Sequence, residues 1–419
     1  MQNLSVNGER LWDSLMEMAQ FGATPKGGCR RLALSDEDKA GRDCFVAWCE
    51  AAGCTISIDQ MGNIFARRPG RDNSLAPVVT GSHLDTQPHG GKFDGVYGVL
   101  AGLEVVRSLN DHGIETEAPI EVAVWTNEEG ARFAPAMVAS GVFGGAFELD
   151  YALACADSDG KTMGEELERI GYAGDMPCGG RPFTANFEAH IEQGPILEAE
   201  NKTVGVVTDV QGIRWFDVTV TGKDSHAGPT PMAVRRDALV GAARMVEAVN
   251  AIGLGNQPNA CSTVGVLEVS PASRNTIPGE VYFSVDLRHP DGSFLDGMDT
   301  ELRAACAAIA DDAGLGVTVE EIWYSPPVAF DSNCVSAVRD AAGRLGYDHR
   351  DIISGAGHDA VYISRVAPTA MIFVPCADGL SHNEEESAES TDLAAGCAVL
   401  LHAMLDRAGV AGDPSTSSG

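Results

Sequence analysis

The spacing of apolar residues changes near residue 211, which divides the chain into segments of different organisation. Before that point, short apolar runs predict strands near 55–59, 63–67, 77–80 and 120–126. Apolar residues at helical spacing predict helices over 7–52, with a polar break near 24–35, and over 96–109. Ser35 followed by Asp38 predicts a capping box at the start of the helix that runs through Ala52. The alternation indicates an α/β domain with a mixed, largely parallel sheet covered by helices.

The segment from 211 to 326 follows a different order. Its apolar pattern predicts, in turn, a strand, a helix, two strands, a helix and a strand, over 215–221, 237–252, 262–269, 281–288, 297–313 and 317–324. This β-α-β-β-α-β order is typical of a compact split-βαβ, ferredoxin-like module. Helix 336–346, strand 369–374 and helix 391–407 follow. We therefore expect one domain built from residues 1–210 and 327–419, interrupted by an inserted domain at 211–326.

Composition narrows the class of protein. The 419 residues are enough for two domains, and 29 basic against 60 acidic side chains give a net charge of −31. Such a charge excludes nucleic acid and anionic membranes as partners. We expect no membrane span and no secretory signal at the N-terminus, and the small polar tail after Arg407 predicts disorder. Eleven cysteines without a C-x-x-C pair indicate a reducing, cytoplasmic compartment.

Three runs carry metal-binding side chains, two at the ends of short apolar strands and one in a glycine-rich turn. P-V-V-T-G-S-H-L-D-T carries His83, G-G-K-F-D-G carries Asp94, and V-A-V-W-T-N-E-E-G carries Glu128 and Glu129. The ends of neighbouring strands meet at one edge of an α/β sheet, and imidazoles with carboxylates suit a pair of zinc-like cations. Each run alone also fits a buried histidine or solvated loop acids. Together and in this order, they predict a metallohydrolase.

Two more imidazoles follow strand-like runs and complete the candidate ligands. They lie in N-F-E-A-H-I-E-Q-G-P and G-L-S-H-N-E-E-E-S, and the full set is His83, Asp94, Glu129, His190 and His382. The adjacent acids Glu128 and Glu129 point in different directions, so one can bind a cation while the other takes a proton from the attacking water. Asp85, two residues after His83, is expected to orient that imidazole.

Eight motifs together make the chain resemble a known family from about Leu11 to Ala408. They are G-S-H-L-D-T, G-G-K-F-D-G, N-E-E-G-A-R-F, A-H-I-E-Q-G-P, H-A-G-P-T-P-M, R-N-T-I-P-G, D-L-R-H and S-H-N-E. The chain resembles the hydantoinase/carbamoylase branch of the zinc-dependent aminoacylase-type metallopeptidases. This resemblance implies a di-zinc aminopeptidase-like domain with an inserted lid and dimerisation domain. His190 favours the amidohydrolases of the branch, because the wider peptidase families often place an acid there.

The resemblance assigns roles to the candidate ligands. It implies that His83, Asp94 and His190 hold one metal ion and that Asp94, Glu129 and His382 hold the other. Glu128 would then be the general base. The implied cofactor is a pair of divalent cations per subunit, zinc first, although manganese, cobalt and nickel also accept nitrogen and oxygen ligands.

The resemblance also implies contacts with the substrate. Gln193 would touch the carbamoyl group, and His226 would polarise the carbonyl or stabilise the oxyanion. Asn275 and Arg288 would bind the substrate carboxylate, with a backbone contact from Gly357. Three of these residues lie in the inserted domain, so we expect a cleft between the domains that closes on the substrate. Without the resemblance, Arg288 reads as a surface strand residue.

The implied assembly is a homodimer formed through the inserted domain, with residues from that domain helping to complete a site. Arg235 and Arg236 lie where such an interface would begin, although an exposed charge pair at a helix start explains them equally well. The contacts of the inserted domain are therefore expected to serve both the substrate and the dimer.

The implied reaction is hydrolysis of the ureido (N-carbamoyl) group of a ureido acid, with release of ammonia and carbon dioxide. N-carbamoyl α-amino acids, N-carbamoyl-β-alanine and allantoate all fit, as substrates of carbamoylases, β-ureidopropionases and allantoate amidohydrolases. Two alternatives of another class stay open. A zinc aminoacylase or dipeptidase would release no ammonia, and a non-catalytic binding protein is disfavoured because the ligand positions and the base are all filled.

Overall fold

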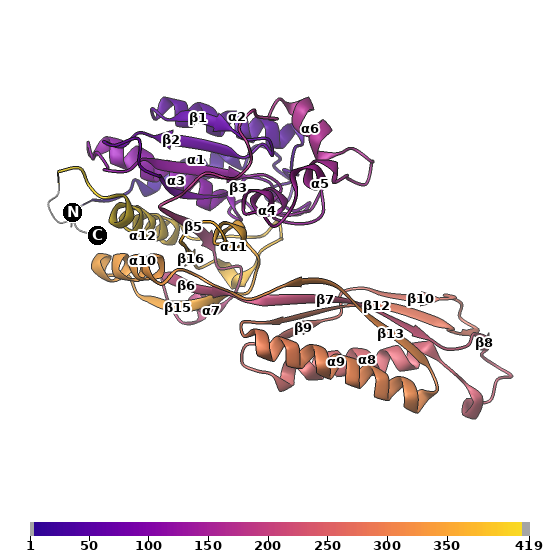
Figure 1. The fold of residues 1–419 in the computed structure, drawn as a ribbon. Coiled ribbons are helices and arrows are strands. Elements are labelled where there is room, and N and C mark those ends of the chain that lie inside the picture. Colours follow the sequence, from indigo (N-terminus) through magenta and orange to yellow (C-terminus); the bar gives the residue numbers. More distant parts are fainter. Residues whose placement is uncertain (1–3, 413–419) are drawn as a thin grey trace. The chain divides into compact units, whose positions relative to one another are not determined.

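The chain divides into two compact units in the computed structural model, which describes residues 4–412 (Figure 1). Unit 1 comprises Met1–Thr208 and Phe330–Gly419, and unit 2 comprises Asp209–Ala329. The polar tail for which the sequence predicts disorder lies, from residue 413 on, outside the described residues.

Unit 1 is built on a mixed sheet with the order β1-β2-β4-β3-β5-β16-β6, and β15 and β14 also pair with β6. The strands are β1 (Thr55–Ile58), β2 (Ile64–Arg68), β3 (Val78–His83), β4 (Ile120–Trp125), β5 (Ala185–Ile191), β6 (Val204–Val210), β14 (Val328–Ala329), β15 (His349–Ser354) and β16 (Thr369–Val374). The central strands β4, β3, β5 and β16 are parallel to one another. Every residue of these four strands is buried, which explains their continuous apolar runs.

Helices cover both faces of this sheet. They are α1 (Gly8–Met18), α2 (Asp36–Ala51), α3 (Val96–Asp111), α4 (Val138–Phe143), α5 (Leu149–Ala154), α6 (Met163–Ile170), α7 (Ile196–Ala199), α10 (Ser332–Leu345), α11 (Asp359–Ile363) and α12 (Ser390–Ala408). Helices α3 and α12 pack together and against the central strands, while α11 packs on β5, β16 and α4. The buried Glu104 of α3 anchors the N-terminal helix through Arg10. This frame fixes the ends of the parallel strands.

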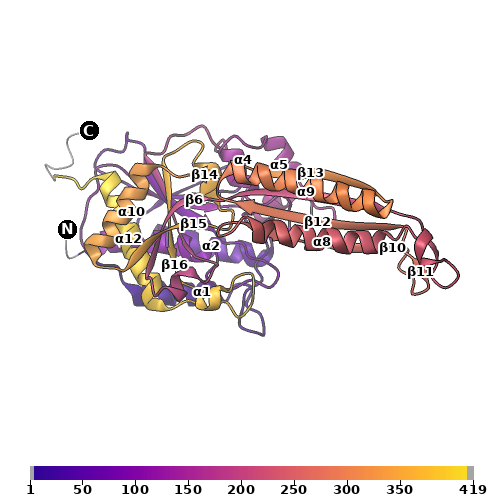
Figure 2. The same cartoon turned by 90° about the horizontal axis from the view of Figure 1, so that it is seen from below.

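Unit 2 is an antiparallel sheet with the order β10-β12-β7-β13, with β9 also paired to β12 (Figure 2). Its strands are β7 (Gly212–Thr221), β9 (Cys261–Thr263), β10 (Leu267–Ser270), β12 (Glu280–His289) and β13 (Gly316–Ser325). Helices α8 (Ala238–Gly255) and α9 (Gly292–Ala313) pack against each other and against β7 and β12. Strand β12 alternates buried and partly exposed residues, as expected for a sheet covered on one face. A short ladder of β8 (Ser225–His226) and β11 (Thr276–Ile277) and the 3-10 turns Met232–Val234 and Ala377–Gly379 complete the elements.

Helix α8 is long and apolar enough, by length and hydropathy alone, to cross a membrane. It is nevertheless a core helix of unit 2, because Ala242, Met245 and Val249 are buried in that unit's apolar cluster. Packing on the sheet explains these buried residues, whereas Val240 and Leu254 of the same helix are exposed.

The fold class predicted from the sequence is confirmed, and the differences are local. The predicted strand 262–269 is two strands, β9 and β10. Between them, the Val266 N–H donates to the Ser284 hydroxyl and not to a strand carbonyl. Ser35 caps α2 as predicted, by accepting from the Asp38 N–H. The Asp38 carboxylate, however, accepts from Leu34 N and Arg42. The short elements α4 to α7 and α11 carry too few turns to give a periodic signal.

Candidate metal centre and active site

The predicted ligands gather at the carboxyl ends of the parallel strands of unit 1. His83 is the last residue of β3, His190 lies next to the end of β5, and Glu128 and Glu129 follow β4. His382 lies in the segment after β16. The sheet order places these four strands side by side, so the ligands share one edge, as the sequence predicts.

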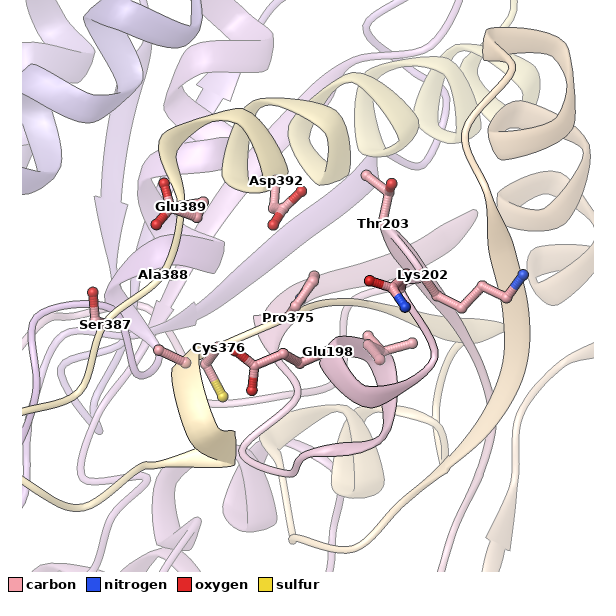
Figure 3. Close-up of a pocket in the computed structure, with 12 residues that line it drawn as sticks. Glu198, Lys202, Thr203, Pro375, Cys376, Ser387, Ala388, Glu389 and Asp392 are labelled. Carbon is pink, nitrogen blue, oxygen red and sulfur yellow. The ribbon is translucent and has the colours of Figure 1, made fainter.

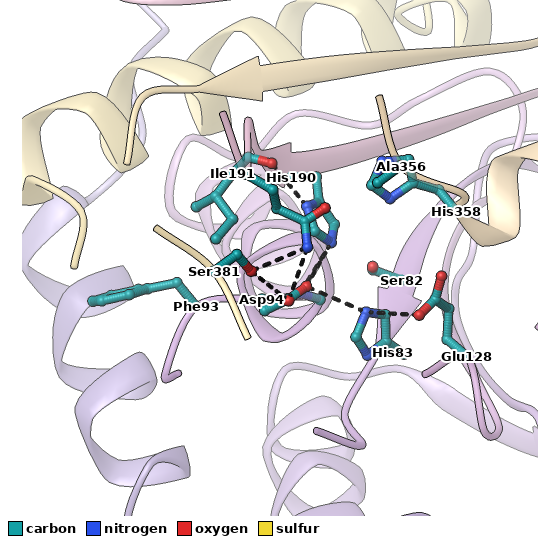
Figure 4. Close-up of polar contacts among 12 residues, drawn as sticks. Ser82, His83, Phe93, Asp94, Glu128, His190, Ile191, Ala356, His358 and Ser381 are labelled. Carbon is teal, nitrogen blue, oxygen red and sulfur yellow. Dashed lines mark hydrogen bonds and ion pairs between the residues drawn. The ribbon is translucent and has the colours of Figure 1, made fainter. Parts of the chain in front are cut away.

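Asp94 lies at the centre of a first buried cluster with His83 and His190. The ligand atoms of these three residues all lie within 4.8 Å of one another. Asp94 Oδ1 is 3.2 Å from His190 Nε2 and 3.7 Å from His83 Nε2 (Figure 4). Two imidazoles and one carboxylate are a common ligand set for zinc.

The other oxygen of Asp94 belongs to a second cluster with Glu129 and His382. His382 Nε2 is 3.4 Å from Asp94 Oδ2 and 3.3 Å from Glu129 Oε2. Asp94 thus offers one oxygen to each cluster. A carboxylate shared in this way is what two neighbouring cations require.

Backbone carbonyls orient the two buried imidazoles. His83 Nδ1 is 2.8 Å from the carbonyl oxygen of Asp85, and His190 Nδ1 is 2.9 Å from that of Ile191. A carbonyl can only accept, so each Nδ1 carries a hydrogen and each Nε2 is the nitrogen that faces Asp94. The Gly95 N–H also donates to His190 Nε2, at 3.1 Å. Lone pairs and carboxylate oxygens that converge on one point fit a cation.

Burial and mutual repulsion of acids characterise the same region. Burial, together with the charges of Asp359 and Glu129, raises the pKa of Glu128 well above its ordinary value. Burial alone would also raise the pKa of Asp94, but the surrounding imidazoles outweigh it and lower that pKa. Burial opposes protonation of His190, yet its contact with Asp94 raises its pKa to about 9. Positive charge is therefore favoured at this point, and divalent cations would supply it.

Asp85 contacts His83 with its backbone and the segment after β4 with its side chain. Its backbone carbonyl, not its carboxylate, contacts His83. The carboxylate instead accepts from the backbone N–H groups of Glu128 and Glu129, at 3.3 Å each. The reason is geometric, because the chain turns after β3 and directs the carboxylate at the segment that follows β4. Asp85 therefore helps to position both acids.

Glu128 lies beside the first cluster and Glu129 beside the second. Glu128 Oε2 is 3.5 Å from His83 Nε2, whereas Glu129 Oε2 contacts Gln87 and His382. The two side chains therefore point in different directions, as the sequence predicts for adjacent acids. This arrangement leaves one acid available for proton transfer while the other takes part in the second cluster.

Two predicted substrate contacts lie in unit 1. Gln193 donates from Nε2 to Asp94 Oδ2 at 2.9 Å and to the Ser381 hydroxyl at 3.1 Å. Its Oε1 is buried and makes no hydrogen bond within residues 4–412. Gly357 follows β15 in a loop, and the Met137 side chain packs against it so closely that a β-carbon there would lie 2.9 Å from Met137 Cε.

Unit 2 brings His226 and Asn275 together. His226 pairs with Thr276 across the β8–β11 ladder, and the Asn275 carbonyl accepts from Ala227 N at 2.8 Å. Both side chains are exposed. His226 Nδ1 accepts from Gly228 N, which leaves Nε2 to face outward. Nε2 is thus free to serve as a donor.

Unit 2 keeps Arg288 apart from that pair. On β12, Arg288 pairs with Ile213 at one end of β7, while Glu280 pairs with Thr221 at the other. The β8–β11 ladder joins at the Glu280 end, where Gly222 N donates to the Gly279 carbonyl. Eight residues of strand separate Glu280 from Arg288, about 27 Å at roughly 3.4 Å per residue. One copy of unit 2 cannot direct Arg288 and Asn275 at the same carboxylate.

The arginines expected at an interface contact their own unit. Arg235 donates to the carbonyls of Ala227 and Thr230, and Arg236 donates to that of Gly314. Arg288 forms an ion pair with Asp286 at 2.9 Å. The interface role of Arg235 and Arg236 stays a prediction.

A cavity of about 290 Å³ lies elsewhere in unit 1 (Figure 3). Its walls come from α7, from the turn that follows it up to Thr203, and from the segment between Pro375 and Asp392. None of the predicted site residues lines it. We therefore place the chemistry at the strand ends and not in this cavity.

Sequence reasoning missed several residues near the ligands, among them Glu188 and His358, whose side chains lie close to His190, and two that contact Asp94. Ser381 and Glu386 both contact Asp94, through its side chain and its backbone N–H respectively. The only signal available was their place in S-H-N-E-E-E-S, on either side of His382. Sequence proximity alone does not predict that they reach residue 94.

A parallel sheet whose carboxyl edge carries two His, Asp and Glu clusters around one shared carboxylate defines the metallohydrolase class. Comparison with known proteins gives the family. Residues 79–406 match the model of peptidase family M20/M25/M40. An N-carbamoyl-L-amino-acid amidohydrolase of Rhizobium meliloti is 53% identical over 97% of this chain and 98% of its own. One from Geobacillus stearothermophilus is 37% identical over 95% and 98%.

Solved structures agree with these relatives. A hydantoinase/carbamoylase family amidase from Burkholderia multivorans has 66% identity and a TM-score of 0.93, over 97% of this chain and 98% of its own. The chain belongs to peptidase family M20/M25/M40 and, within it, to the hydantoinase/carbamoylase amidases. The resemblance carried by the sequence motifs is therefore confirmed.

Proposed function

We propose that this protein hydrolyses the N-carbamoyl group of an N-carbamoyl L-amino acid and releases ammonia and carbon dioxide. The 53% identical relative that carries this activity in its name supports the proposal. The arrangement of acids and imidazoles in unit 1 supports the same chemistry independently.

The cofactor of this proposal is a pair of divalent cations. His83, Asp94 and His190 would hold one, and Asp94, Glu129 and His382 the other. The nitrogen and oxygen donor set suits zinc best, and manganese, cobalt and nickel also accept it. When bound, the cations would polarise the ureido carbonyl and make a water molecule acidic.

The side chains of this chain would then move the proton. Glu128 would take a proton from the attacking water as a new C–O bond forms at the carbonyl carbon. It would return that proton to the leaving amine nitrogen as the C–N bond breaks. The products are the free amino acid and carbamic acid, which decomposes to ammonia and carbon dioxide.

The proposed substrate contacts divide between the two units. Gly357 and Gln193 would act from unit 1, with Gln193 at the carbamoyl group. Arg288 and Asn275 would bind the carboxylate, and His226 would stabilise the oxyanion. Because Arg288 lies about 27 Å from the β8–β11 ladder along an extended strand, we propose that a second copy supplies His226 and Asn275. The functional unit is then a homodimer formed through unit 2.

The orientation of Gln193 is the observation that favours a ureido group over an acyl group. Asp94 carries only acceptor atoms, so the Gln193 NH₂ group must face it. The buried Oε1 is then left to accept a hydrogen bond. The terminal NH₂ of a ureido group donates one, whereas an acetyl methyl group does not. An unsatisfied buried acceptor costs about 1–3 kcal/mol, roughly ten- to hundredfold in the specificity constant.

An assay of ammonia and amine release tests this function. We expect N-carbamoyl L-amino acids to be cleaved with ammonia release, N-acetyl analogues to be cleaved at least tenfold more poorly, and a chelator to abolish both. Gln193→Leu should lose more of its rate on the ureido substrates than on the acetyl ones. Preferred cleavage of acyl or dipeptide substrates would favour the aminoacylase or dipeptidase alternative. We further propose a cytoplasmic location, because all eleven cysteines are free.

A further inference from the structure

Glu386 is a buried carboxylate to which the proposed reaction gives no role. Its side chain belongs to a residue only 2% exposed, four positions after His382. Its Oε1 accepts from the backbone N–H groups of Phe93 and Asp94, at 2.9 and 3.2 Å. A carboxylate buried this deeply is thus satisfied by the backbone of the Asp94 turn.

Ser381 joins the same carboxylate to the side chain of Asp94. Its hydroxyl lies 2.8 Å from Asp94 Oδ2 (Figure 4) and 3.2 Å from Glu386 Oε2. Its single hydrogen can serve only one of them at a time, and Asp94 is the nearer. Asp94 Oδ2 is also the oxygen that faces His382. Glu386 therefore holds the backbone of Asp94, and Ser381 holds the oxygen of the second cluster.

Gly91 makes room for this arrangement. A β-carbon at position 91 would overlap the carboxyl group of Glu386. Gly91 lies outside the left-handed region of φ, so its backbone does not require glycine. The lack of space beside Glu386 therefore explains why position 91 is glycine. Metal binding by itself does not explain this glycine of G-G-K-F-D-G.

The second cluster depends on this contact more than the first does. His83 and His190 lie on strands, with side chains 2% and 1% exposed. His382 lies in a loop, its side chain is 52% exposed, and its φ is 53°. The sheet fixes the first pair, whereas the position of His382 relative to Asp94 must come from the loop that carries it.

We propose that Glu386, Ser381 and Gly91 form a brace that positions Asp94 and His382 for the second cation. They are positioning residues, since none of them is a proposed ligand. The proposal rests on the two-cation function above. Loss of the brace is expected to weaken the second cation much more than the first.

Titration of the metal-free full-length protein with Zn²⁺ against a chromophoric chelator tests the brace. The wild type is expected to bind two cations. Ser381→Ala, Glu386→Gln and Gly91→Ala should bind the second about 10- to 100-fold more weakly, the usual cost of losing a partner behind a metal ligand. The first affinity should change less than threefold. Co²⁺ absorption, followed per equivalent added, should show the second ligand field altered and the first unchanged.

Glu385→Gln is the matched control. It removes the same charge from the neighbouring, exposed residue of the same loop, and it should bind both cations like the wild type. If Glu386→Gln or Gly91→Ala does not fold, the affinity of Ser381→Ala for the second cation tests the brace. This variant is expected to fold because it removes only a hydroxyl.

Wild-type affinity for both cations in Ser381→Ala and in every other folded brace variant would overturn the brace, and so would equal weakening of both cations. Activity is measured separately. A wild type that binds two cations but cleaves no ureido substrate would refute the proposed function and leave the brace intact.

Discussion

At the scale of single residues, the main question is how two adjacent acids take different roles. Both are held by the same group, because the Asp85 carboxylate accepts from the backbone N–H of each. With the backbone fixed, Glu128 turns toward His83 and Glu129 toward His382. The two acids thus have different neighbours, which supports the proposal that one transfers the proton and the other binds a cation.

Replacing each acid by its amide tests this division. Glu128→Gln keeps the shape but cannot accept a proton, so turnover should fall about 10²–10⁴-fold while both cations stay bound. Glu129→Gln should instead lose the second cation. Turnover on an N-carbamoyl amino acid and metal content by elemental analysis are measured on both variants. Loss of metal in Glu128→Gln and its retention in Glu129→Gln would mean that the two roles are exchanged.

At the scale of elements, the turn between β3 and α3 brings Asp94 to His83. Gly95 lies at its end with φ 69°, and a β-carbon there would overlap the His83 ring. Its N–H also contacts His190. The turn therefore requires glycine for both its backbone conformation and its space.

Gly95→Ala should consequently lose metal from the first cluster, because the His83 ring must move. Gly113→Ala is the control at the other end of α3. Gly113 has a similar φ of 62° and no neighbour within 4 Å of a built β-carbon. Both variants should lose about 1–2 kcal/mol of unfolding free energy from backbone strain. Only Gly95→Ala should lose metal as judged by elemental analysis, and equal metal content would refute the steric argument.

Elements of this kind also show what a sequence can predict. The parallel strands are buried on both faces, so their continuous apolar runs predict them. The polar residues that follow, including His83 and Glu128, could be predicted in the same way. Contacts made by loops were not readable. Ser381 and Glu386 reach Asp94 across nearly 300 positions, and the Asp85 carboxylate accepts from the backbone N–H of Glu128 on the next strand's loop. Periodicity contains no information about such contacts.

At the scale of the whole molecule, the register of unit 2 limits how a substrate can be held. The antiparallel pairing of β12 with β7 is continuous from Glu280 to His289, so no bend brings the ends of β12 together. Motifs alone placed Arg288 and Asn275 on one carboxylate, and only the register reveals their separation. A carboxylate of a few ångströms cannot span about 27 Å of strand, so the two proposed contacts would need two copies of the chain, as in the proposed homodimer.

Heterodimers with two different tags test this requirement, because each homodimer of Arg288→Ala or His226→Ala should be nearly inactive. If His226 comes from the partner, a heterodimer of the two single variants contains one intact site and should show about half of the wild-type turnover. The matched heterodimer pairs the wild type with the Arg288→Ala/His226→Ala double variant. It carries the same two substitutions, yet each of its sites lacks one group, so it should be inactive. The opposite result, with activity in the second heterodimer and none in the first, would show that each site is built from one chain. In that case His226 and Asn275 do not act on a substrate that Arg288 of the other copy binds. Only a substrate long enough to span the separation along β12 could then contact all three residues of one chain.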